Sequence, residues 1–234
     1  AVIMDPKDEY RGLVKAGFAK WGVYGPKELD NSPEKWYQLI VQNKKLVLAK
    51  YDLPENAQSQ QVLRNIAIAC RMLFESQQNP PKIMLVVDEA HEFAPEGEKY
   101  PDPIKQLASR GRGENISVIW VTQSLSYLSK DIVNRFNGWY AGGFNGVGSD
   151  LDHLKVEYNK DVHNTTYQGQ VRGLPDALHA DEGPIPLRKF TDETGNTVGS
   201  EWIYSDDTGD LRRETRQNVE MKSTHYGRQG YKLN

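Results

Sequence analysis

The sequence predicts an α/β fold, in which a mostly parallel sheet carries helices on both faces and is followed by a small irregular or β-rich carboxyl-terminal extension. Two observations predict it. Short segments that are apolar along their whole length are typical of strands buried on both faces. These segments alternate with longer ones of helical periodicity, and such alternation favours parallel pairing.

Five short segments have the composition of strands, at 2–4, 46–48, 83–87, 116–121 and 139–141. Helices are expected between them, at 33–43, 57–76, 104–110 and 131–136. The first of these helices begins with Ser32 as N-cap and Pro33 at its first position, both favourable there. Residues 11–31 contain four glycines and are expected to form a loop and a short helix.

The composition changes near Gly142, so we expect a core at 1–145 and an extension at 146–234. Within the extension, a helix is expected at 151–158 and strands at 167–172 and 185–190. A hairpin is expected at 200–215, with its turn at Thr208 and Gly209. The last twenty residues are polar and are expected to pack weakly.

Composition restricts the partners and the compartment. The net charge of −3 gives no general attraction to nucleic acid, so a contact with DNA would need a local basic patch or a ring of subunits. Cys70 is the single cysteine, which excludes an intrachain disulfide and favours a reducing compartment. No apolar run approaches the roughly 20 residues of a membrane-spanning helix, and no signal peptide is visible, so no membrane partner is expected.

Asp88 and Glu89 follow directly on the apolar strand at 83–87 and have the form of a Walker B motif. Ligands of open α/β sheets bind at the carboxyl ends of the strands. One carboxylate there can hold Mg²⁺ through water, and a second can orient or deprotonate an attacking water. The alternative is that the two acids merely begin a solvated helix, where negative charge is favourable.

Four segments occur in an order typical of one family: VIMDPKDEY at 2–10, LVVDEAHEFAPE at 85–96, LASRGRGENISVIWVTQ at 107–123 and DIVNRFNGWYAGGF at 131–144. Together they resemble the HerA–FtsK group of P-loop ATPases, ring motors that translocate or package DNA, and within it the archaeal and viral HerA-like branch. The resemblance covers roughly residues 1–145. It implies a RecA-like core, ATP and Mg²⁺ as cofactors, double-stranded DNA as partner, and a homo-oligomeric, hexameric ring. It also implies a cytoplasmic location, in an archaeal or bacterial cell or a virus-infected host.

The resemblance also implies catalytic roles. Asp88 would hold Mg²⁺ through water, Glu89 would position the hydrolytic water, and Gln123 would sense the γ-phosphate. Arg112 is the candidate for an arginine finger that reaches a neighbouring subunit, because a planar guanidinium suits the charge on transferring phosphate oxygens. Arg110 is its rival, and for both the alternative is a solvated helix end.

Further acidic positions of the family pattern are matched by Asp5 and Glu9, which are candidates for cofactor binding with no clear individual role. His91 is expected to be structural or a relay rather than a metal ligand. Two other motifs are excluded. A DEAH-box helicase needs a second motor domain, for which the chain is too short, and HExxH fails because residue 95 is proline.

The sequence departs from the family in one respect: it contains no GxxxxGK[ST] phosphate-binding loop. Gly17 and Gly22 have the glycine spacing, but Val23 and Tyr24 follow them. In the family, the missing strand and helix lie just before the VIMDP-like strand, and their loss would leave an unpaired sheet edge. Two hypotheses follow: an ATPase motor completed by an upstream P-loop, which we favour, and a nucleotide-incompetent structural or regulatory subunit with the same fold.

Overall fold

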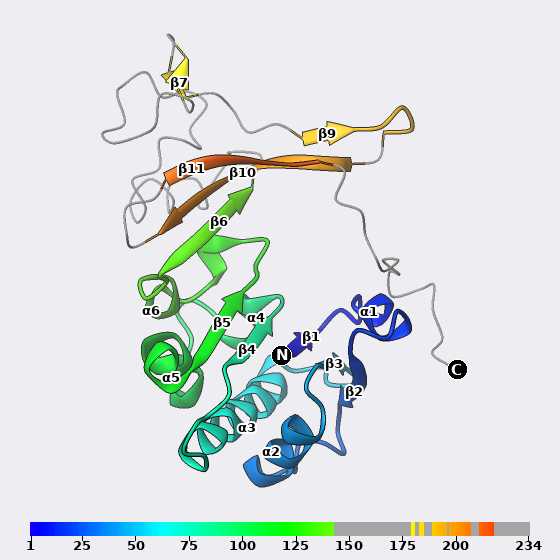
Figure 1. The fold of residues 1–234 in the computed structure, drawn as a ribbon, viewed down its shortest axis with the longest axis vertical. Helices are drawn as coiled ribbons and strands as arrows, with labels where there is room; N and C mark the ends of the chain where they lie inside the picture. The colour runs from blue at the N-terminus through cyan, green and yellow to red at the C-terminus, as the bar shows by residue number, and fades with distance from the viewer. Residues whose placement is uncertain (143–178, 181–182, 185–188, 196, 207–210, 218–234) are drawn as a thin grey trace. The chain divides into compact units, whose positions relative to one another are not determined.

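The structure is a computed structural model that describes residues 1–142, 179–180, 183–184, 189–195, 197–206 and 211–217. The described residues fall into two compact units, at 1–133 and 134–217 (Figure 1). The first unit contains the predicted α/β core, and the second contains a small antiparallel sheet.

The first unit contains a five-stranded, wholly parallel sheet in the order β2-β3-β1-β4-β5. Its strands are β1 Val2–Asp5, β2 Lys20–Tyr24, β3 Leu46–Lys50, β4 Ile83–Val87 and β5 Ile116–Trp120. This confirms the predicted α/β class with a RecA-like arrangement. Because β4 lies between β1 and β5, the segments that follow these three strands meet at one edge of the sheet.

The longer helices are α2 Pro33–Gln42, α3 Asn56–Glu75 and α5 Asp102–Arg110, and α3 contacts both of the others (Figure 1). The apolar stripe predicted on α3 is buried, at Val62, Ile66, Ala69, Cys70 and Leu73. Shorter helical turns are α1 Arg11–Lys15, α4 Ala90–Phe93, η1 Gly111–Glu114, η2 Leu125–Tyr127 and α6 Lys130–Val133.

The two faces of the sheet differ over β4 and β5. Ile83, Leu85 and Val87 of β4 alternate with the other side chains of the strand and are buried. On the opposite face, Met84 and Ile119 are each 46% exposed. The continuous apolar run of β4 predicts that both faces of the strand are buried. At this end of the sheet, however, the described residues cover only one face.

The sequence prediction missed one strand and misassigned another. β2 lies within 11–31, where a loop and a short helix were expected. A Cβ added at Gly22 of β2 would lie 3.1 Å from Leu48 Cδ2, so the glycine allows β2 to pack closely on β3. The strand expected at 139–141 exists as β6 Gly138–Gly142, but it pairs antiparallel with β10 and is not part of the parallel sheet. The helix expected at 131–136 ends at Val133.

In the second unit, β10 Thr197–Asp206 pairs antiparallel with β11 Leu211–Gln217, with β6 and with β9 Lys189–Thr191. The first of these pairings covers the segment in which the sequence predicts a hairpin, although the expected turn lies outside the described residues. β7 His179–Ala180 and β8 Gly183–Pro184 form a separate two-stranded pair. The segments 151–158, 167–172 and most of 185–190 and of the polar tail also lie outside the described residues.

Among the residues that the structure describes, none of the helices has both the length and the apolar character needed to cross a bilayer.

Because the apolar stripe of α3 is buried, a valine-to-alanine substitution on it should destabilise the protein more than the same substitution at an exposed helix position. Val62 on α3 is fully buried and Val41 on α2 is 46% exposed, so both changes to alanine raise helix propensity but only one empties core volume. We expect Val62→Ala to lower the free energy of unfolding by about 2 kcal/mol and Val41→Ala to change it by less than about 0.5 kcal/mol. Urea unfolding followed by circular dichroism measures both; equal effects would contradict this packing.

Candidate active site

Backbone hydrogen bonds bring the ends of three strands together. The N–H of Asp88 donates to the carbonyl of Met4 at 3.2 Å, which ties the end of β4 to β1. The N–H of Val121 donates to Val87 at 2.9 Å, and the N–H of Ala90 donates to Val121 at 2.8 Å. The ladder between β4 and β5 therefore continues past both strands, and Asp88 and Glu89 lie in the turn that it encloses.

Glu89 occupies a sparsely populated backbone conformation in this turn. Its φ of 46° is left-handed, a region that costs non-glycine residues energy and is often retained at functional sites. Its side chain is only 6% exposed. The fold therefore holds the carboxylate in a fixed position at the carboxyl edge of the sheet.

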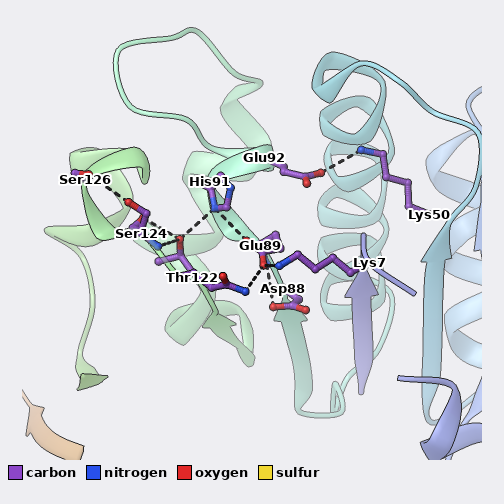
Figure 2. A network of polar contacts seen from close by, with 10 residues as sticks. Lys7, Lys50, Asp88, Glu89, His91, Glu92, Thr122, Ser124 and Ser126 are labelled. Carbon is purple, nitrogen blue, oxygen red and sulfur yellow. Dashed lines mark hydrogen bonds and ion pairs between the residues drawn. The ribbon is translucent and has the colours of Figure 1, made fainter. Parts of the chain in front are cut away.

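Three side chains contact the Glu89 carboxylate (Figure 2). Lys7, from the segment after β1, forms an ion pair with Oε1. Gln123, three residues past the end of β5, donates from Nε2 to the same oxygen at 3.0 Å. His91 places Nδ1 3.4 Å from Oε2. The predicted pair of Glu89 and Gln123 is thus in direct contact.

His91 also fixes the segment that carries Gln123. Its Nδ1 lies 3.2 Å from Thr122 Oγ1, and that hydroxyl donates to the carbonyl of Ser124 at 2.9 Å and accepts the N–H of Ser124 at 3.2 Å. Figure 2 shows this chain of contacts running from Glu89 through His91 to the loop after β5. His91 therefore contacts both the Glu89 carboxylate and the segment that carries Gln123.

Asp5 is fully buried, and its two oxygens accept the N–H groups of Glu9 and Tyr10, each at 2.9 Å. These bonds use the carboxylate to shape the turn after β1. Burial raises the pKa of Asp5 to about 6, against the opposing effect of the two N–H donors, and the nearby charges of Asp8 and Asp88 raise it further.

Asp88 lies beside this group, and its Oδ1 accepts the N–H of Glu89 at 3.0 Å. Burial raises the pKa of Asp88, and the negative charges of Glu89 and Glu9 act in the same direction. A site that disfavours its own negative charge favours an added cation. The described residues contain no group of three His, Cys, Asp or Glu side chains able to hold a metal. Asp88 is one carboxylate that could hold Mg²⁺ if waters and phosphate oxygens supplied the other ligands.

The two candidate arginines lie elsewhere. Arg110 ends α5 and Arg112 lies in η1, and both precede β5. They are therefore at the amino edge of the sheet, whereas Asp88 and Gln123 are at its carboxyl edge. A five-residue strand spans about 16 Å, so the backbone places neither arginine at the site of its own chain.

Sequence analysis missed Lys7 as a site residue. The available signal was its position, two residues past the end of β1, on the same edge as the Asp88–Glu89 turn. A single lysine in a polar loop is usually solvated, and nothing local distinguishes this one. The contact depends on β1 and β4 being neighbours, which only the fold establishes.

The order of the parallel strands and the helices packed on them give the first unit a RecA-like α/β fold. Similar solved structures are those of the genome packaging NTPase B204 from Sulfolobus turreted icosahedral virus 2. Its sulfate complex has a TM-score of 0.53 at 12% identity, covering 94% of this chain and 96% of that chain. Its AMPPCP complex has a TM-score of 0.51 at 12% identity, and its ATP-gammaS complex 0.50 at 11%, each covering 91% of this chain and 94% of that one. At these identities the likeness shows the fold. No protein-family model matches the chain, and no curated protein matches its sequence.

The raised pKa of Asp5 predicts a pH effect on stability. Below about pH 4 the carboxyl is protonated in both states; as the pH rises to about 6, the unfolded chain loses this proton first. The free energy of unfolding should therefore fall over that range, by up to about 3 kcal/mol for this group. Asp5→Asn should remove this part of the pH dependence.

Urea unfolding between pH 4 and 7 measures the slope, and Asp30→Asn, at an exposed position, is the charge-matched control. An unchanged slope in Asp5→Asn would contradict the assignment.

Proposed function

We propose that this chain is the catalytic part of a motor subunit that hydrolyses ATP to translocate or package double-stranded DNA, of the HerA–FtsK type. The observation that carries the proposal is the contact of Gln123 with Glu89, beside Asp88, at the carboxyl ends of adjacent parallel strands. The likeness in fold to a viral genome packaging NTPase crystallised with ATP analogues supports it.

Each residue then has a chemical task. Asp88 holds Mg²⁺, which when bound neutralises charge on the phosphates. Glu89 accepts a hydrogen bond from the attacking water and orients it toward the terminal phosphate. Gln123, an uncharged amide just past the end of β5, contacts the same water or the terminal phosphate, so that loss of the phosphate is sensed by the segment after β5. Asp5 accepts the N–H groups of Glu9 and Tyr10 and so holds the turn that carries Lys7 and Glu9.

The phosphate-binding loop comes, in this proposal, from a strand–loop–helix segment outside the 234 residues. Among the described strands, β5 is the edge next to the site and has no partner on its outer side. The sheet face beside it exposes Met84, Ile119 and Val121, the last 37% exposed. A parallel strand added to β5 and followed by a helix would cover this apolar face and bring its loop to the carboxylates.

An alternative is a nucleotide-incompetent structural or regulatory subunit, which is favoured by the lack of GxxxxGK[ST] in the 234 residues. The two candidates differ in one feature of the natural gene. The motor requires an in-frame GxxxxGK[ST] in the coding sequence ahead of β1, and the inert subunit does not.

The proposal predicts a separation of binding from hydrolysis in the full-length protein. Glu89→Gln keeps the shape of the side chain but removes the negative charge that orients water, so turnover of Mg-ATP should fall at least about 100-fold. Affinity for Mg-ATP, measured by calorimetry, should change less than about threefold, because Glu89 binds water rather than nucleotide.

The control is Glu92→Gln, three residues along, whose carboxylate pairs with Lys50 at 3.1 Å and not with Gln123. It should retain turnover. Undiminished turnover in Glu89→Gln would exclude Glu89 as the water-orienting group, and failure of the wild-type protein to bind Mg-ATP would favour the inert subunit.

Because both candidate arginines lie at the opposite edge of the sheet from Glu89, we expect two inactive variants to restore activity when their subunits are mixed. Arg112→Ala and Glu89→Gln should each be inactive, because each active site would combine Glu89 of one subunit with the arginine of its neighbour. In randomly mixed rings, one interface in four joins an intact Glu89 to an intact arginine. Equal mixtures should therefore recover about a quarter of wild-type ATPase activity.

Arg110→Ala in the same assay distinguishes the two candidates, because only the finger residue should give an inactive subunit that is rescued by mixing. No recovery from either arginine variant would contradict action across subunits.

A further inference from the structure

Both oxygens of the Glu89 carboxylate are engaged in this structure. Oε1 accepts from Gln123 at 3.0 Å and is also ion-paired with Lys7, while Oε2 faces His91 Nδ1 at 3.4 Å. Each carboxylate oxygen has about two acceptor sites, so Lys7 and Gln123 together saturate Oε1. A residue that orients an attacking water must have such an acceptor site available. The arrangement is therefore a resting one, in which Glu89 is held but not ready to bind water at Oε1.

Lys7 is the partner best able to leave. Its side chain is 37% exposed, whereas that of Glu89 is 6% exposed, and its flexible stem carries a compact charge on rotatable bonds. Partly exposed ion pairs contribute little to stability, so exchange of this contact for another anion costs little. Gln123 is also exposed, but its neighbour Thr122 is held by contacts with His91 and Ser124, which restrain the backbone that carries the amide.

The surroundings of Lys7 also indicate what would attract it. Glu89 contributes most to raising the pKa of Lys7, and the charges of Glu9 and Asp88 act in the same direction. A terminal phosphate that reaches Asp88 through a bound cation would enter the same small region with more negative charge than a single carboxylate. An ammonium group binds phosphate well as a point charge.

We propose that Lys7 is a phosphate-responsive latch: its ammonium group holds Glu89 when the site lacks a terminal phosphate, and transfers to that phosphate when the nucleoside triphosphate binds. The transfer frees Oε1 of Glu89 to accept the attacking water, while Gln123 keeps the carboxylate in position. This inference rests on the proposed function, because it takes a nucleoside triphosphate as the ligand of the carboxyl edge.

Lys50 is a suitable control position for the Lys7 substitution. Lys50 is the last residue of β3, at the same edge of the sheet as Lys7, and it too forms an ion pair with an acidic residue, Glu92 (Figure 2). That pair does not include Glu89. Lys50→Met therefore removes the same charge from the same edge of the sheet without touching the latch.

The test compares affinities of the full-length protein for AMPPCP and for ADP, each with Mg²⁺, by calorimetry. Lys7→Met should weaken AMPPCP binding at least about tenfold, because a charge-assisted contact to the terminal phosphate is lost. It should weaken ADP binding less than about twofold. Lys7→Arg should restore most of the AMPPCP affinity, and Lys50→Met should leave both affinities unchanged.

Equal losses for AMPPCP and ADP, or no loss for either, would overturn the latch while leaving nucleotide hydrolysis in place. Failure of the wild-type protein to bind either nucleotide would overturn both the latch and the proposed function. The two failures are thus distinguishable by the wild-type result alone.

A second measurement avoids dependence on the Lys7→Met variant. In reductively ¹³C-methylated wild-type protein, the Lys7 resonance, assigned by its loss in Lys7→Arg, should move on addition of AMPPCP and not on addition of ADP. In Glu89→Gln it should already differ before any nucleotide is added. A resonance that ignores both AMPPCP and the Glu89 substitution would overturn the latch.

Discussion

The parallel pairing of β4 between β1 and β5 is the constraint on which the candidate site depends. Its register aligns Met4, Val87 and Trp120, so the chain leaves all three strands at one level. Lys7 then follows β1, Glu89 follows β4 and Gln123 follows β5. Residues more than 30 positions apart in sequence are in contact because three short strands end together.

The site keeps features that do not favour folding by themselves. Glu89 has a left-handed backbone, and Asp5 and Asp88 are buried carboxylates whose pKa values are raised. Such features persist when the surrounding structure enforces them, here through the ladder between β4 and β5 and the N–H groups that Asp5 accepts. Their concentration at one sheet edge is typical of a functional site.

Much of the fold was predictable because its signals are local. The apolar run before Asp88 and the periodic stripe of α3 are sufficient to predict β4 and its neighbouring helix. β2 was missed because Gly22 and exposed side chains weaken its pattern, and β6 was assigned to the wrong sheet because a strand's composition does not specify its partner. The nearness of Glu89 and Gln123 was predictable, because each follows the end of a strand and the two strands were expected to be parallel. Lys7 was not, since its contact depends on the order of strands in the sheet.

In the proposed motor, Asp88, Glu89 and Gln123 surround the terminal phosphate of a bound nucleotide. A crystal structure of the full-length protein with Mg²⁺ and AMPPCP tests it most directly. We expect the terminal phosphate at the carboxyl edge between β4 and β5, with the cation on the Asp88 side and Lys7 withdrawn from Glu89. A nucleotide bound at the amino edge or in the second unit, with the Lys7–Glu89 pair intact, would contradict it.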